Sequence, residues 1–528
     1  MYKQQKLELD RLQDNVSTGR MSRREFLSRL SAMGLGAMAP ALYSQSSFAA
    51  PQKGGRLRVG IGHGSTTDML DPATYENGYM LFYNMAQNNH MFETNDKGKL
   101  VPELVESYDV DDSAKTWIFN LRKGVEFHNG KSLDSDDVIA SFQHHRGETK
   151  SPVKGLLEQI TSIRKDGKHQ VIFELNAGNA DFPYIAGDYH IAILPSKDGK
   201  IAANDGIGTG PYMGKDFDPG VRSLLTRNPN YWKEGHGHFD EMEFLSIIDP
   251  MARTNALTTG EVDLIDRVET KTAHLLGRKP GIILDETTGY AHYTFPMLLD
   301  VPPFDDNNVR LALKWALPRQ EMVEKVLYGH GAIGNDIPIS TVNTYHNSEL
   351  EQHQYDPDKA KFYANKAGGV KVPLHVAEAG FPGSVDAAVL YQEKAAAIGI
   401  EIDVIREPND GYWSNVWIKK PWCACYWGGR PTEDWMFTIT HASGGSWNDT
   451  HFSNERFDDL LVTARAETDT NKRREMYYEM QAIVHGEGGT VVPMFNNYLF
   501  ARSDKVQHGT MAGNWDVDGY KMERWWFA

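Results

Sequence analysis

Cysteine is nearly absent from this chain, which has two in 528 residues, Cys423 and Cys425. They lie two positions apart, so in an extended strand both side chains point to one face, a geometry that does not suit a disulfide. Redox and zinc sites use Cys-x-x-Cys spacing or additional ligands. We therefore expect two small buried hydrophobic residues and a fold that does not depend on disulfides.

Long apolar runs and an excess of positive charge are missing as well. No internal apolar stretch approaches the roughly 20 residues that cross a membrane. The formal net charge is −16 at pH 7, which argues against nucleic acids and anionic membranes as partners because phosphate binding needs a basic surface. A chain of this length exceeds one hydrophobic core and implies two or three domains.

Motifs for catalysis and for metal binding are also missing. The histidines of His144-His145 and His236-Gly237-His238 have no carboxylates or cysteines at ligand spacing beside them. Ser446-Trp447 and Gly64-Ser65 do not form a nucleophile elbow, and no glycine-rich phosphate loop is present. The sequence predicts no catalytic residue, no metal site and no cofactor.

The first 49 residues have the features of an export signal. Ser22 to Leu27 carries a twin-arginine pattern, an apolar segment runs from Leu30 to Leu42, and the small-residue site Ser47-Phe48-Ala49 precedes Ala50. These features predict a Tat signal over residues 1–49, cleavage after Ala49, and a periplasmic protein that folds before export. The alternative is an amphipathic N-terminal helix that stays attached.

The stretch Pro421–Trp435 is the best candidate for a binding site. Trp422–Trp427 is apolar and aromatic, which predicts a buried strand, and Gly428-Gly429 ends it in a form that permits close backbone approach. A core strand with a solvated loop is the alternative. The side chains that supply charge or flat walls there are those of Arg430, Glu433, Asp434, Tyr426, Trp427 and Trp435.

The second half of the chain predicts an α/β domain. Val372–Ala379 and Glu401–Ile405 have strand patterns, and Ser384–Ala397 between them has helical periodicity that Gly399 terminates. Such a unit normally places two strands in parallel, with ligand sites beyond the strand ends. Further helices are predicted over Asp358–Ala367, Asn454–Glu467 and Asn471–His485.

One segment is more specific than the rest. Thr116–Arg122 alternates as a strand, Lys123–Gly130 forms a turn, and Ser132–Phe142 begins a helix that Asp134 or Ser135 caps. Further motifs follow in order at Gly208–Tyr212, Arg227–Trp232, Ala256–Asp263, Pro302–Asp306 and Val309–Leu313. Together they closely resemble the large solute-binding proteins of ABC importers, family 5, which includes the dipeptide and oligopeptide receptors of the periplasm. The resemblance covers essentially all of residues 54–528.

The resemblance implies an α/β, two-lobed periplasmic-binding-protein fold of the large peptide-binding type. Lobe I is expected over residues 50–292 and 497–528, with an extra subdomain at about 86–205, and lobe II over residues 293–496. The crossing strands are expected near Tyr290–Phe295 and Met494–Phe500. Ligand is expected between the lobes, where hinge closure buries it.

The resemblance also implies a function without catalysis. We expect a monomer that captures short peptides or peptide-like solutes and delivers them to ABC permease subunits in the inner membrane. The same role for a non-peptide solute, such as an oligosaccharide, an opine-like conjugate, an amine or a nickel complex, is the first alternative. A periplasmic hydrolase or chaperone on the same fold is the second.

The resemblance points to site residues, with one departure. In peptide-binding members the loop after the strand carries an aspartate that pairs with the ligand's amino terminus, and matching from Trp427 places Arg430 there. Arginine suits carboxylates and repels ammonium. Either Glu433 or Asp434 takes the amine, or the ligand is not an ordinary peptide; alternatively Arg430 faces solvent or pairs with Glu433. The expected ligand-binding residues are Trp427, Trp413, Tyr426, Gly428, Arg430, Asp434, Trp447 and Tyr498.

Overall fold

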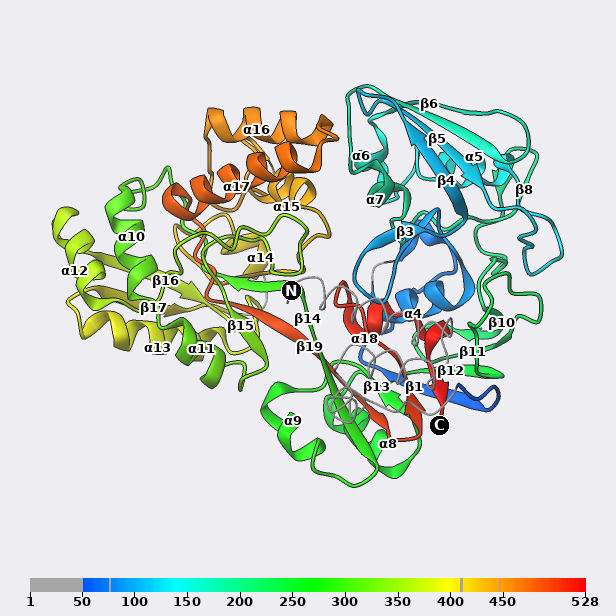
Figure 1. Ribbon diagram of the computed structural model, residues 1–528. Coiled ribbons are helices and arrows are strands. Elements are labelled where there is room, and N and C mark those ends of the chain that lie inside the picture. The colour runs from blue at the N-terminus through cyan, green and yellow to red at the C-terminus, as the bar shows by residue number, and fades with distance from the viewer. Residues whose placement is uncertain (1–50, 76, 409–411, 446) are drawn as a thin grey trace, which may run out of the picture. The chain divides into compact units, whose positions relative to one another are not determined.

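The computed structural model describes residues 51–75, 77–408, 412–445 and 447–528, without the side chains of Trp413 and Ser414. Residues 52–527 form one compact unit (Figure 1). The predicted Tat signal, residues 1–49, lies outside the described residues. In the part of the chain that the structure describes, no helix is both long and apolar enough to cross a membrane.

The largest sheet contains nine strands among the described residues. β1 is parallel to its neighbours β12 and β13, and the other pairings are antiparallel. The strand order is β10 (Tyr212–Asp218), β11 (Arg222–Arg227), β12 (Glu241–Ser246), β1 (Arg56–Ile61), β13 (Leu264–Ile265), β19 (Met494–Ser503), β14 (Ile282–Thr294) and β18 (Cys425–Trp427), and β15 (Gly331–Ile333) also pairs with β19.

The first core forms where α4 (Gly78–Gln87) packs on this sheet. Nine of the ten α4 residues are buried, and the Tyr79 hydroxyl lies 2.6 Å from the Ser223 hydroxyl oxygen. The end of the chain returns to this core through Trp525, next to the pair of β20 (Val506–Gln507) and β21 (Trp526–Phe527). A neighbouring core contains α8 (Pro250–Thr259) and α9 (Thr270–Leu276).

A smaller antiparallel sheet carries the segment that the sequence marked as most specific. Its order is β4 (Val105–Val110), β5 (Thr116–Leu121), β7 (Gln170–Leu175) and β6 (Ile160–Lys165). The alternation predicted for β5 is confirmed, because every second residue is buried. The other elements of this region are β2 (Phe92–Thr94), β3 (Leu100–Pro102), α6 (Lys154–Leu157), α7 (Phe182–Ala186), β8 (Ser196–Lys197) and β9 (Lys200–Ile201).

The predicted helix start in this region is confirmed as α5 (Ser135–His144). Asp134 is the N-cap, and it forms a capping box with Asp137. Ser135, the other candidate cap, instead directs its hydroxyl to the carbonyl oxygens of Gly167 and Gln170, each at 3.2 Å. The serine thus anchors the helix to the start of β7 and to the loop before it.

The strand, helix, strand unit of the second half is confirmed. β16 (Lys371–Val376) and β17 (Glu401–Arg406) are parallel and joined through α13 (Ser384–Ala396), with Gly399 at a φ of 84° after the helix. Asp356 caps α12 (Pro357–Lys366), with proline in the first turn. Together with α10 (Asn307–Ala316) and α11 (Arg319–Lys325), these elements enclose one core.

A separate core is built from α15 (Glu433–Thr440), α16 (Glu455–Ala466) and α17 (Thr470–Glu487). The predicted helices over 454–467 and 471–485 are confirmed to within two residues at each end. The short α14 (Tyr412–Asn415) precedes this region. Trp427 at the end of β18 belongs to this core, which therefore extends to the predicted site.

Two long strands, β14 and β19, run between these cores and pair along most of their length. Leu284 and Ala501 pack with α8 and α9, whereas Phe295 and Met494 pack with the core around α13. Figure 1 shows β14 and β19 as the strands that pass from one group of elements to the other. The lobe boundaries expected from the sequence, at residues 292/293 and 496/497, stay a prediction; both positions lie within these strands.

The predicted strand over Trp422–Trp427 is wrong in its extent. Only Cys425–Trp427 forms a strand with β14, while Trp422 makes an isolated bridge to Met297 and Cys423 makes one to His375. The apolar run changes partners midway, so no single ladder continues along it. Both cysteines are free and buried, as expected.

Candidate functional site

The glycine break follows directly after β18, which is the end strand of the large sheet. Trp427 is paired with His292 of β14. Gly429 has a φ of 72°, and a Cβ there would lie 2.2 Å from the Cβ of Tyr290. Only glycine fits such an approach. Gly428 has open space where a Cβ would be, so the predicted close approach of backbone occurs at Gly429 alone.

Arg430 follows the break and is half-buried. Its Nη1 atom donates to the carbonyl oxygen of Gly429 at 2.6 Å, and the guanidinium carbon lies 5.8 Å from the centre of the Trp435 ring. Burial lowers the pKa of Arg430, and Tyr189 and Asp188, which follow α7, partly offset this effect. Within the described residues no carboxylate forms an ion pair with Arg430, so the pairing with Glu433 that the sequence left open is not formed.

The two carboxylates expected to replace the aspartate of peptide-binding members are engaged inside the protein. Both oxygens of Asp434 accept from Nε of Arg465, at 3.0 and 3.1 Å. Glu433 is 2% exposed and accepts from the backbone N–H of Tyr345 at 2.6 Å. Burial raises the pKa of Glu433 to about 7 and the pKa of Asp434 to about 6.

Three tryptophans form what we call the indole cluster, namely Trp417, Trp427 and Trp447. Their ring centres lie 6.0 to 6.2 Å apart. Nε1 of Trp417 and Nε1 of Trp427 both donate to Oδ2 of Asp449, each at 3.2 Å. Asp449 is 3% exposed, and burial raises its pKa to about 6. One carboxylate oxygen therefore holds two of the three rings.

The members of the indole cluster differ in exposure. Trp427 is 7% exposed and packs in the core with α15 to α17, whereas Trp447 is 49% exposed. Trp447 is therefore the tryptophan of this cluster with the largest solvent-exposed surface. Sequence reasoning missed Trp417 and Asp449, although Trp417 lies four residues after Trp413 and Asp449 lies two residues after Trp447.

The remaining predicted residues are not members of the indole cluster, or their side chains lie outside the described residues. Tyr426 is 51% exposed and alternates with the buried Trp427 along β18. Tyr498 is half-buried on β19, where a Cβ on Gly289 would lie 2.2 Å from its ring. Burial raises the pKa of Tyr498. The side chain of Trp413 lies outside the described residues, so its expected role stays a prediction.

A direct contact joins α7 of the smaller-sheet region to α16 and α17. Nη2 of Arg473 lies 2.6 Å from Oδ2 of Asp181, and both side chains are at most 10% exposed. The backbone N–H of Ala180 donates to the carbonyl oxygen of Arg465 at 2.7 Å. Figure 1 shows α7 opposite the α16 and α17 pair. Arg465 also binds Asp434, so this contact adjoins the first turn of α15, which follows the glycine break.

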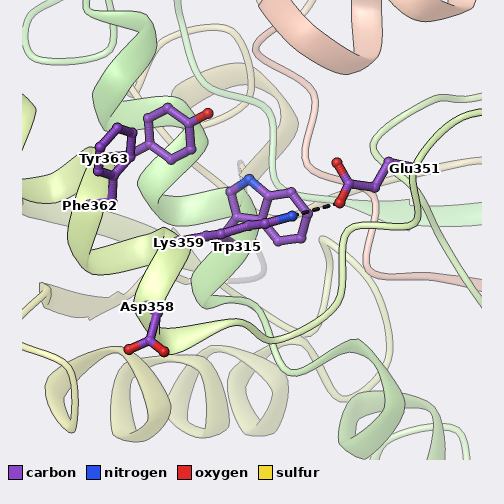
Figure 2. Close-up of a pocket in the computed structure, with 6 residues that line it drawn as sticks. All are labelled: Trp315, Glu351, Asp358, Lys359, Phe362 and Tyr363. Carbon is purple, nitrogen blue, oxygen red and sulfur yellow. Dashed lines mark hydrogen bonds and ion pairs between the residues drawn. The ribbon is translucent and has the colours of Figure 1, made fainter.

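Surface hollows of about 470 Å³ occur elsewhere. Figure 2 shows one of them, where the Lys359 ammonium lies 3.8 Å from the centre of the Trp315 ring and 2.6 Å from Oε1 of Glu351. Another is lined by Arg122, Lys123 and Trp232 among others. Neither hollow includes a residue of the predicted site.

Side chains that could bind a metal ion or act as nucleophiles were sought among the described residues. Within them, no group of three or more His, Cys, Asp or Glu side chains is arranged to hold a metal ion. Burial raises the pKa of Cys423 and that of Cys425, which disfavours the reactive thiolate.

Comparison with known proteins shows which family has this architecture. The sequence profile described as bacterial extracellular solute-binding proteins, family 5 Middle, matches residues 99–449, more than half of the chain. This chain belongs to that family. The family consists of substrate-binding transport components rather than enzymes, and the α/β, two-lobed fold expected from the sequence is that of its members.

Several family 5 relatives have known ligands. Di/tripeptide-binding protein 1 of Pseudomonas aeruginosa is 26% identical over 452 residues, 78% of this chain and 83% of that protein. The periplasmic binding protein DppA of Helicobacter pylori, solved with the peptide STSA, has a TM-score of 0.72 at 20% identity over 90% of this chain and 98% of its own. AgaA of A. tumefaciens R10, solved with agropinic acid, has a TM-score of 0.71 at 23% identity; the match covers 90% of this chain and 99% of AgaA.

Proposed function

We propose that this family 5 protein is the receptor of an ABC importer that captures short peptides or peptide-like solutes. It closes its two lobes around the solute and delivers it to permease subunits in the inner membrane. It acts as a monomer, without nucleic acid, cofactor or catalysis of its own. Residues 1–49 export it to the periplasm by the twin-arginine pathway.

The proposed lobes follow the expected boundaries. Lobe I comprises residues 50–292 and 497–528, with the extra subdomain at about 86–205, and lobe II comprises residues 293–496. The separate cores at the two ends of β14 and β19 support this division. Hinge motion at these strands is the proposed route to closure.

The observation that carries the proposal is the family match over residues 99–449, which contains both the glycine break and the indole cluster. The peptide ligands of similar proteins support peptides as the solute class. Aromatic rings supply flat walls for peptide planes at a small cost in conformational entropy. Trp447 offers such a face at the proposed site.

A second candidate keeps the receptor role but changes the solute to an oligosaccharide, an opine-like conjugate, an amine or a nickel complex. Arg430 favours an acidic member of this group, because it replaces the aspartate expected in peptide-binding members. A hydrolase or a chaperone on the same fold is the alternative of another class. The fate of the solute separates these classes, because a receptor releases its solute unchanged.

The test incubates residues 50–528 with a defined mixture of di- to pentapeptides and follows the mixture by mass spectrometry over hours. The proposal predicts saturable 1:1 complexes by native mass spectrometry and full recovery of every peptide after denaturation. Loss of peptides with appearance of their fragments would establish a hydrolase. Binding of unfolded proteins in preference to the short peptides would establish a chaperone.

A further inference from the structure

Arg430 has more hydrogen-bonding capacity than the protein uses. A guanidinium presents five N–H donors, and one hydrogen bond from Arg430 is formed within the described residues, from Nη1 to the carbonyl oxygen of Gly429 at 2.6 Å. The Nε and Nη2 edge, which is the geometry that grips a carboxylate with two parallel bonds, donates to no described residue. The side chain is nevertheless half-buried and held against the Trp435 ring.

Other arginines near the site are satisfied inside the protein. Arg473 pairs with Asp181 at 2.6 Å and also donates from Nε to the carbonyl oxygen of Ala464 at 2.9 Å. Arg465 binds both oxygens of Asp434 and the hydroxyl of Thr438. These two arginines have structural partners, whereas Arg430 has a backbone carbonyl and a ring.

The acidic groups around Arg430 are committed to other contacts. Glu433 accepts from the backbone of Tyr345, and Asp434 accepts from Arg465. Asp188, the acidic residue near Arg430 from lobe I, accepts from the backbone N–H of His190 at 2.9 Å and contacts Nδ1 of the same histidine at 2.7 Å. Among the described residues no carboxylate pairs with this partly desolvated cation, and burying a charge is costly unless an anion pairs with it.

The location of Arg430 fits a contact with solute. It directly follows the break at Gly429, and its electrostatic neighbours Tyr189 and Asp188 belong to the region after α7. The guanidinium therefore lies where lobe I approaches the end of β18 in lobe II. Trp435 backs the guanidinium at 5.8 Å, which limits its rotamers and orients the unused edge.

We propose that Arg430 determines solute specificity by binding a carboxylate or another anionic group of the solute between the lobes. This inference rests on the proposed receptor function and narrows its solute class to acidic solutes. A solute whose anchor is a free ammonium group is disfavoured at this position, because Arg430 repels it and Glu433 and Asp434 are engaged.

The test uses a metabolite extract that an anion exchanger has separated into a retained, anionic fraction and an unretained fraction. Residues 50–528 are dialysed to equilibrium against each fraction, and the solutes concentrated by the protein are measured by mass spectrometry. Four proteins are compared: the wild type, Arg430→Gln, Arg430→Lys and Arg456→Gln. Arg456 is the control, because it is exposed and pairs with Glu479 on the surface of α16. Circular dichroism verifies the fold of each variant.

The inference predicts that the wild type concentrates a solute from the anionic fraction. Arg430→Gln should weaken its binding about 10- to 100-fold, as expected for loss of hydrogen bonds to a charged group, while Arg430→Lys restores part of the affinity and Arg456→Gln leaves it unchanged. Capture from the unretained fraction alone, or equal affinity of Arg430→Gln and wild type, overturns the inference but leaves the receptor function standing. Capture from neither fraction overturns the receptor function itself, and the inference with it.

Discussion

Arg473 of α17 and Asp181, the residue before α7, form an ion pair at 2.6 Å that joins α17 to the start of α7. Asp181 and neighbouring tyrosines raise the pKa of Arg473 against the opposing effect of burial. The backbone bond from Ala180 to Arg465 lies beside this pair. The start of α7 is thus held against α16 and α17 by groups other than the proposed solute contacts.

Removal of this ion pair should loosen the contact between α7 and the α16 and α17 pair, and so favour a more extended molecule. Because breaking a buried pair leaves an uncompensated charge, Arg473→Gln and Asp181→Asn should each destabilise the packing of α7 against α16 and α17 by about 3 kcal/mol. Small-angle X-ray scattering of the solute-free protein measures the effect as a larger radius of gyration. Arg474→Gln is the matched control, because the neighbouring Arg474 pairs with Glu475 at the surface. Identical scattering from Arg473→Gln and wild type would show that this ion pair does not hold α7 against α16 and α17.

The hydrogen bonds that Asp449 accepts from the indole cluster should stabilise the fold. Asp449→Leu removes the acceptor of two indole N–H groups and should cost about 1–3 kcal/mol in the free energy of unfolding. Asp449→Asn retains an acceptor oxygen and should lose less than half of that amount. Urea denaturation followed by circular dichroism measures both. Equal losses in the two variants would show that the two indole hydrogen bonds do not matter to the fold.

Truncation of the buried Trp427 and of the exposed Trp447 should have different effects on stability. Trp427 is 7% exposed, so Trp427→Ala should cost about 3–5 kcal/mol of stability. Trp447 is 49% exposed, so Trp447→Ala should change stability by less than about 1 kcal/mol. A loss of solute affinity in Trp447→Ala, measured by titration calorimetry with the captured solute, would then report binding alone. Unchanged affinity would remove Trp447 from the site.

Glu433 should make stability depend on pH. Burial raises its pKa from an ordinary 4.5 to about 7, so the folded protein binds this proton more tightly than the unfolded chain does. The stabilising contribution of the proton is complete below pH 4.5 and disappears as the pH rises through about 7. Glu433→Gln should therefore gain stability relative to wild type between pH 5 and pH 8, by up to about 3 kcal/mol.

Denaturation midpoints measured across this pH range check the prediction for Glu433. Glu455→Gln, a change at an exposed residue of the first turn of α16, is the control and should follow the wild type. A difference between Glu433→Gln and wild type that stays constant from pH 5 to pH 8 would contradict the raised pKa.

Local patterns predicted much of the fold. The Asp134 cap, the alternation of β5 and the periodicity of α13 each depend on neighbouring residues, so they were readable from the chain. The pairing of the Trp422–Trp427 run could not be predicted from the sequence, because its partners lie far away along the chain. Its first half makes bridges to Met297 and His375, and its second half pairs with β14.

The site was predictable in part for the same reason. The glycine break and Arg430 follow one another in sequence and could be recognised there. The commitment of Asp434 to Arg465, and of two indoles to Asp449, depends on residues 22 to 32 positions apart. Only the folded arrangement shows that these carboxylates are engaged and that, within the described ranges, none of them pairs with Arg430.

Native mass spectrometry of the protein purified from its host is the most direct test of a solute receptor. A solute receptor should be found as a 1:1 complex with a small solute that is released intact on denaturation and rebinds to the refolded protein. A protein that carries no solute, takes up none from a host extract and instead changes the composition of that extract would contradict a solute receptor.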